Sequence, residues 1–85
     1  MTKLEQKLID LGYVNDYYNA YLGEYEYIKA IPDVAELHIY YSPINKTYYG
    51  MCITTRKVIS QNVIDNLQQS YNQLQKDLEV LKEYE

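Results

Sequence analysis

The chain contains no phenylalanine and no tryptophan, yet twelve of its 85 residues are tyrosine. A hydrophobic core can be built without hydroxyl groups, so packing alone does not require that every aromatic residue carry one. Tyrosine joins a large apolar ring to a hydrogen-bonding tip, and it is enriched in binding surfaces. The missing aromatics therefore direct attention to the segment DYYNAYLGEYEY, residues 16–27, which holds five of the tyrosines.

Cysteine, histidine and glycine are scarce, and this scarcity excludes several kinds of catalytic and cofactor site. Cys52 is the single cysteine, so no disulfide can form within the chain, and a reducing compartment is expected. One histidine, His38, and one cysteine on different strands cannot make a structural zinc site, and no second histidine is present to activate the thiol. The three glycines are scattered and form no phosphate-binding loop. We therefore expect a protein that is not an enzyme and needs neither a cofactor nor a metal.

Long hydrophobic runs and a basic face are missing as well. The opening MTKLEQKLIDLGY has no apolar signal region, and no stretch reaches membrane-spanning length. The net charge is −4, with acid concentrated in residues 16–36 and 61–85. Because a protein that binds duplex DNA usually presents a basic surface, direct DNA binding is not expected. These absences predict a single soluble, cytoplasmic domain spanning residues 1–85, without a membrane partner.

The residues that are present predict an α+β fold with one helix at each end. Thr2 followed by Glu5 fits a capping box, and Gly12 fits the position just past the last turn, so a helix of about ten residues is expected at the N-terminus. Residues 13–23 are rich in turn formers and are expected to form a loop. Alternation of polar and apolar residues then predicts three strands, at 24–30, 35–42 and 47–55.

Two turns, IPDV at residues 31–34 and SPINK at residues 42–46, separate the three predicted strands. Short turns of this kind imply an antiparallel meander. In the middle strand, Leu37 and Ile39 alternate onto one face, so His38 is expected at an exposed position on the other. The predicted architecture is a three-stranded antiparallel meander between a short N-terminal and a long C-terminal helix, in the order α-β-β-β-α.

The C-terminal helix has the clearest periodicity. From Ser60, a candidate N-cap, apolar residues recur at spacings of three and four, as in a coiled-coil heptad. A helix of about 23 residues would extend about 35 Å, whereas a strand of seven or eight residues spans only about 25 Å. We expect the overhang to meet the N-terminal helix or a second copy of the chain, which predicts a homodimer. The seam consists of Ile64, Leu67, Tyr71, Leu74, Leu78 and Leu81.

The tyrosines of residues 16–27 allow two interpretations. One is bland: tyrosine favours strands and packs well, and an AT-rich genome enriches it, although such a genome would enrich phenylalanine equally. The other is a binding surface, on which Glu24 and Glu26 project carboxylates about 7 Å apart and mimic nucleic acid to a basic protein groove. Tyr17, Tyr18 and Tyr21 are expected to be the most exposed. The predicted partner-binding residues are Tyr17, Tyr18, Tyr21, Glu24, Tyr25, Glu26 and Tyr27.

Two segments carry a resemblance to a known group of proteins. The run VIDNLQQSYNQLQKDLEVLKEYE and the opening KLEQKLIDLGY resemble the closing and opening helices of small uncharacterised proteins encoded by phages and prophages of low-GC Gram-positive bacteria. The resemblance implies a phage accessory gene and supplies no activity and no functional residues. Small acidic phage proteins without catalytic motifs are often inhibitors of host machinery, including anti-CRISPR proteins. By this analogy, the expected partner is a host defence protein, such as an effector that binds nucleic acid.

Two other functions stay open on the sequence. The chain could sequester a nucleotide, with tyrosine rings stacking on the base and with Arg56 and Lys57 holding the phosphates. It could also be a structural accessory protein of a phage whose long helix serves only to dimerise it.

Overall fold

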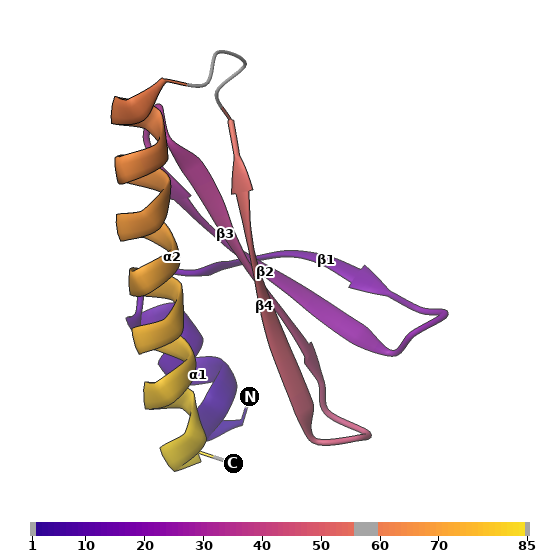
Figure 1. Ribbon diagram of the computed structural model, residues 1–85. Coiled ribbons are helices and arrows are strands. Elements are labelled where there is room, and N and C mark those ends of the chain that lie inside the picture. The colour runs from indigo at the N-terminus through magenta and orange to yellow at the C-terminus, as the bar shows by residue number, and fades with distance from the viewer. Residues whose placement is uncertain (1, 56–59, 85) are drawn as a thin grey trace.

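The computed structural model describes residues 2–55 and 60–84, and within them the α+β class is confirmed (Figure 1). The sheet has four strands, one more than the sequence predicted. The elements in chain order are α1 (Lys3–Asp10), β1 (Val14–Asn19), β2 (Glu24–Ile31), β3 (Ala35–Ser42), β4 (Thr47–Thr54), α2 (Gln61–Leu81) and the 3-10 turn η1 (Lys82–Tyr84).

The four strands form one antiparallel sheet in the order β1-β2-β3-β4. The predicted meander is therefore correct for β2, β3 and β4, but the loop predicted over residues 13–23 is wrong, because Val14–Asn19 pairs with β2. Two of the turn formers, Asn19 and Gly23, lie where the strand ends and the turn to β2 begins. The Asn19 side chain accepts hydrogen bonds from the amides of Tyr21 and Leu22, and Gly23 takes a φ of 65°. They close a hairpin and do not interrupt the strand.

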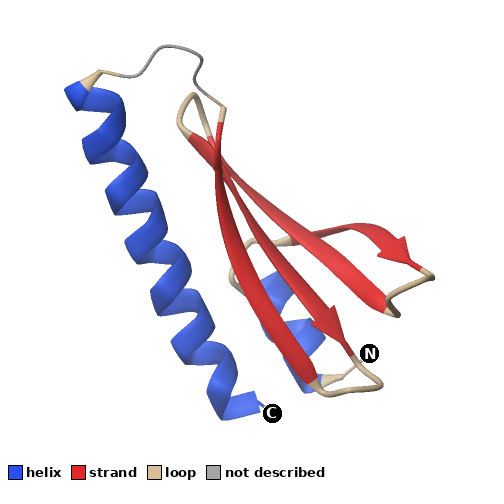
Figure 2. Ribbon diagram, turned by 45° about the vertical axis from the view of Figure 1, so that its right-hand side comes forward, coloured by secondary structure: helices blue, strands red, loops and turns tan. Residues whose placement is uncertain are grey.

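Both α-helices lie on the same side of the sheet, and the other side is open (Figure 2). As predicted, Leu37 and Ile39 of β3 point into the space under the helices, and both are fully buried. The capping box predicted at Thr2 is present, and it starts α1. The buried core consists of Leu4, Leu8, Tyr13, Tyr27, Leu37, Ile39, Tyr41, Leu74 and Leu81.

Helix α2 begins after Ser60, whose Oγ accepts a hydrogen bond from the Val63 amide at 3.4 Å. Its C-terminal end packs beside α1, where Leu81 joins the core (Figure 1). The overhang thus meets one of the two partners predicted for it. Gly50 of β4 allows a close approach of the helix, since a Cβ built there would lie 3.0 Å from Cδ1 of Leu74.

The residues of the predicted seam are not all buried against the sheet. Leu74 and Leu81 are buried, whereas Ile64 and Tyr71 are 46% and 48% exposed. A straight α-helix drifts about 20° per heptad from a strict seven-residue repeat, and α2 packs on β3 and the edge strand β4. One flank of the seam therefore overhangs the sheet edge. Inward positions along the helix are taken by Val63, Ser70, Leu74, Asp77 and Leu81.

A buried polar cluster ties the start of β1 to α2. The Tyr13 hydroxyl donates to Oδ2 of Asp77 at 2.8 Å, and Nε2 of Gln73 donates to Oδ1 of the same carboxylate at 3.0 Å. Nζ of Lys29 lies 3.5 Å from Oδ2. Asp77 is only 2% exposed. Burial, followed by the hydrogen bond to Asp77, raises the pKa of Tyr13 above its usual value, so this phenol remains a donor.

Candidate protein-binding surface

The tyrosine-rich segment forms a projecting hairpin, which we call the hairpin arm, residues 16–25. It comprises most of β1, the turn and the start of β2, and it swings away from α2 at the right of Figure 1. Tyr17, Tyr18 and Tyr21 are 57%, 45% and 101% exposed. Their exposure is as predicted, although Tyr17 and Tyr18 lie on a strand and not on a loop.

The seven predicted contact residues do not share one surface. Tyr17 pairs with Glu26 across the strands and lies on the open face, whereas Tyr18 pairs with Tyr25 on the helix side, with ring centroids 4.6 Å apart. Tyr27 is 1% exposed and belongs to the core, so its prediction as a contact residue is wrong. The reason is that successive strand residues point to opposite faces, and Tyr27 points to the face of β2 that the helices cover.

Residues of β3 and β4 complete the open face beside the arm. The rings of Tyr40 and Tyr49 stack with centroids 4.9 Å apart, and the Tyr49 hydroxyl donates to Oε1 of Glu24 at 3.1 Å. These side chains border a hollow of about 250 Å³, which we call the open-face hollow. Its lining consists of Tyr17, Asn19, Leu22, Glu24, Glu26, Tyr40, Tyr49 and Met51.

Sequence reasoning missed Tyr40, Tyr49 and Met51 as members of the site, although a signal for them was present. The turn at residues 42–46 joins β3 to β4, and pairing the strands across it places Tyr40 opposite Tyr49. Alternation along each strand indicates which residues share a face of that strand, but only the pairing of β3 with β4 brings Tyr40, Tyr49 and Met51 onto one common face.

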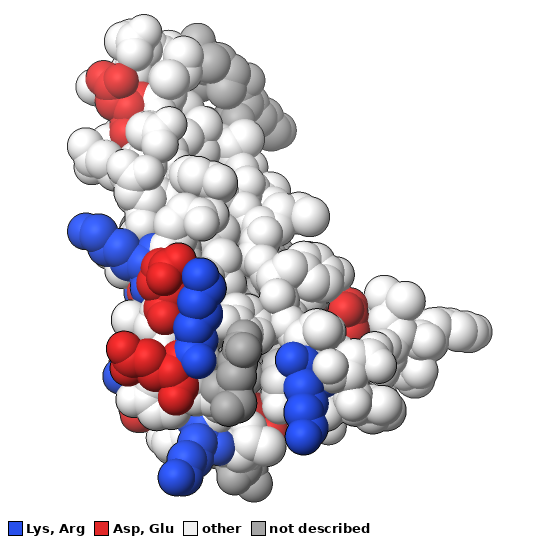
Figure 3. All heavy atoms as spheres, turned by 60° about the horizontal axis from the view of Figure 1, so that its bottom comes forward, with Lys and Arg blue, Asp and Glu red and all other residues white. Residues whose placement is uncertain are grey.

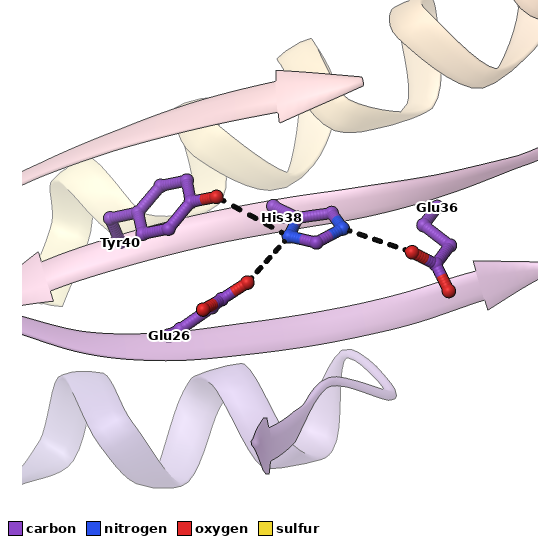
Figure 4. Close-up of polar contacts among 4 residues, drawn as sticks. All are labelled: Glu26, Glu36, His38 and Tyr40. Atoms are coloured by element: carbon purple, nitrogen blue, oxygen red, sulfur yellow. Dashed lines mark hydrogen bonds and ion pairs between the residues drawn. The ribbon is translucent and has the colours of Figure 1, made fainter. Parts of the chain in front are cut away.

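His38 lies at the centre of the open face in a network of polar contacts (Figure 4). Its Nδ1 lies 2.8 Å from Oε1 of Glu26, and its Nε2 lies 3.2 Å from Oε1 of Glu36. The Tyr40 hydroxyl is 3.4 Å from Nδ1. A neutral imidazole carries one N–H, so only the doubly protonated ring can donate to both carboxylates at once.

The prediction that His38 is exposed is wrong, because the residue is 7% exposed. Alternation correctly put it on the face away from the helices. On that face, however, it sits on a central strand between Ile28 of β2 and Met51 of β4, and neighbouring side chains cover it. Burial of this kind depends on strand order, which alternation along one strand does not reveal.

The open face is acidic. Glu24, Glu26 and Glu36 outnumber His38, so the face keeps a negative charge in either protonation state of the imidazole. Burial, with help from Glu24 and Glu26, raises the pKa of both Tyr40 and Tyr49, so these phenols stay neutral. Figure 3 shows lysine side chains close to acidic ones at the end of the molecule where the helices lie.

Other predicted residues lie elsewhere. Ile64, Leu67 and Tyr71 line a shallower hollow of about 350 Å³ between α2 and β4, together with Cys52. Burial raises the pKa of the Cys52 thiol. The predicted phosphate-holding residues Arg56 and Lys57 lie outside the described residues.

Two further findings concern the described residues, 2–55 and 60–84. No group of three or more His, Cys, Asp or Glu side chains there could hold a metal ion. None of the helices there is both long and apolar enough to cross a membrane. In comparisons with known proteins, no family model, no curated protein and no solved structure matches the chain.

Proposed function

We propose that the chain is a non-enzymatic interaction protein that binds another protein through the hairpin arm and the open face of the sheet. The observation that carries this proposal is the set of large apolar side chains exposed around the open-face hollow. Tyr17, Leu22, Tyr49 and Met51 are each between 47% and 60% exposed, and all four line the same hollow. Tyrosine and methionine are enriched in protein–protein interfaces, and soluble monomers rarely expose large contiguous apolar patches.

The tip of the molecule extends this surface. Tyr21 is fully exposed, Leu22 is 60% exposed and Ile44 is 81% exposed. Ile44, in the turn between β3 and β4, reaches to within 3.7 Å of a Cβ built on Gly23, so the two turns meet at one end of the sheet. An apolar tip beside an acidic, aromatic hollow offers anchors of the kind that dominate binding energy in protein interfaces.

The partner that fits this surface is a basic one. Glu24 and Glu26 are alternate residues of β2 on the open face, and alternate residues of a strand lie about 7 Å apart, a spacing that suits mimicry of nucleic-acid phosphates. Together with the resemblance to phage and prophage proteins, this supports an inhibitor of a host defence protein, acting in the bacterial cytoplasm in the manner of an anti-CRISPR protein. Long-range attraction between opposite charges would speed association.

The alternatives are less well supported. A nucleotide in the open-face hollow would bring its phosphates toward Glu24 and Glu26, which repel them. A homodimer formed by α2 stays a prediction, but Leu74 and Leu81 are already used by the chain's own core. The seam residues that remain well exposed for a second copy are Ile64 and Tyr71.

Affinity capture from a lysate of a low-GC Gram-positive bacterium tests the proposal. The tagged wild type is compared with the double variant Tyr17→Ser/Tyr21→Ser, and with Tyr84→Ser on the helical side as the matched control. If either arm tyrosine is a hot spot of about 2 kcal/mol, the double variant should bind about thirtyfold more weakly. Both variants should melt near the wild-type temperature, because the replaced side chains are exposed. Equal retention of the same proteins by all three forms, or no retained protein, would contradict the proposal.

A further inference from the structure

The open-face hollow combines carboxylates with aromatic walls. Glu24 and Glu26 reach it from β2, and the stacked rings of Tyr40 and Tyr49 reach it from β3 and β4. Tyr17 lines it from β1. Aromatic faces attract cations through their quadrupole, and carboxylates attract them through charge. The two kinds of group thus favour the same ligand class.

The carboxylates keep hydrogen-bonding capacity for a ligand. The Tyr49 hydroxyl binds Oε1 of Glu24, and the ring of His38 binds Oε1 of Glu26. A carboxylate has about four acceptor positions on its two oxygens, so one such bond leaves it able to accept more. Among the described residues that line the hollow, none is a lysine or an arginine. The charge of the hollow is therefore complementary to a cation from outside the chain.

The geometry favours a planar cation. A guanidinium group can stack on an aromatic ring and donate two parallel N–H bonds to one carboxylate, whereas an ammonium group acts as a point charge. The Tyr40–Tyr49 pair provides rings inclined by only 23° to each other, next to Glu24. Neutral phenols at both positions place no tyrosinate in the hollow, so its charge comes from the glutamates.

We propose that the open-face hollow is a binding site for one arginine side chain of the partner protein. The guanidinium group stacks against the tyrosine wall and donates hydrogen bonds to Glu24 and Glu26. This inference rests on the proposed function and gives the partner surface a definite chemistry, an exposed arginine at the centre of a basic patch.

Nuclear magnetic resonance on the isolated chain tests the site without the partner. Arginine capped at both ends as an amide is titrated into labelled protein, and the methyl resonance of Met51, which lines the hollow, is followed. Capped citrulline, of the same shape but neutral, and capped lysine serve as controls. Capped arginine should shift the Met51 signal saturably in the millimolar range, with citrulline at least about tenfold weaker and lysine in between.

Two variants test whether the Glu24 carboxylate and the Tyr49 ring contribute to arginine binding. Glu24→Gln keeps the size of the side chain and should weaken arginine binding by about fivefold or more, as should Tyr49→Leu, which removes the ring. Glu79→Gln on α2, whose side chain is 70% exposed, is the matched charge control and should change nothing. The assignment would be overturned if the Met51 shift does not saturate with capped arginine, or if citrulline or lysine binds as tightly as arginine. It would also be overturned if Glu24→Gln and Glu79→Gln weaken arginine binding equally. The wild-type comparison of ligands decides the question even if a variant fails to fold. Failure here, with partner capture still dependent on the arm, would leave the proposed function intact.

Discussion

Replacing Tyr13 with phenylalanine removes one oxygen atom and should destabilise the fold out of proportion to that change. The Tyr13 hydroxyl makes the shortest of the three polar contacts described above for the Asp77 carboxylate, at 2.8 Å from Oδ2, and both residues are 2% exposed. Without the hydroxyl, a buried carboxylate loses a donor and water cannot replace it. A hydrogen bond to a charged group contributes about 1.5–3 kcal/mol.

The remaining partners of Asp77 do not compensate fully. Gln73 donates to the other oxygen, Oδ1, and Lys29 lies 3.5 Å from Oδ2 with 24% of its side chain exposed. Solvent screening weakens that ion pair. A loss of about 2 kcal/mol from Tyr13→Phe should lower the melting temperature by roughly 8–16 °C in a domain of this size.

Circular dichroism during thermal and urea denaturation measures the effect. The matched control is Tyr21→Phe, which removes a hydroxyl that is fully exposed and should stay within about 0.5 kcal/mol of wild type. In an Asp77→Asn background, where the charge is gone, Tyr13→Phe should cost at least about 0.5 kcal/mol less than in the wild type. Equal effects of Tyr13→Phe and Tyr21→Phe would refute the reasoning.

Three further outcomes follow from the packing, the helix cap and the buried tyrosines. Gly50→Ala should lower the unfolding free energy by about 1–3 kcal/mol in urea, because the new Cβ lies 3.0 Å from Leu74; a stabilised variant would show that α2 can move away freely. Ser60→Ala should cost about 1 kcal/mol in the same assay, and Ser60→Asp should retain most of the cap. Burial, and after it the negative charge of Glu5, raises the pKa of Tyr27 from 10.0 to about 12, so the folded state holds the phenol proton more tightly than the unfolded state does. The contribution of Tyr27 to the unfolding free energy should therefore be fully present below about pH 10 and should be lost as the pH rises toward 12. Urea midpoints measured between these pH values should fall less steeply for Tyr27→Phe than for the wild type. The same pH dependence in both proteins would contradict this prediction.

The sequence predicts those elements whose signals are local. The capping box at Thr2 and the N-cap at Ser60 mark real helix starts, and alternation assigns the faces of β3 correctly. Strand β1 was not predicted because it is an edge strand with an irregular register. Asn15 pairs with Tyr27 of β2, and Asp16 lies at the register shift, where a turn-forming residue is tolerated.

The candidate site likewise contains residues that the sequence of one strand predicts and residues that it does not. Glu24 and Glu26 could be placed together from alternation along one strand, whereas Tyr40 and Tyr49 join them only through pairing between strands. The burial of His38 and the split of the α2 seam likewise depend on strand order and on where the helix crosses the sheet. These are relations between distant segments, which periodicity within one segment does not contain.

The attachment of the hairpin arm has an evolutionary consequence. Strand β1 is hydrogen-bonded to β2 alone within the described sheet, and its side chains contribute little to the core. Substitutions at the arm positions that face solvent therefore carry a small penalty in stability, while the helices and β3 preserve the fold. A lineage under pressure from a changing partner could revise residues 16–22 repeatedly without rebuilding the scaffold. Related chains should then diverge fastest in the arm and slowest at the residues that surround Asp77.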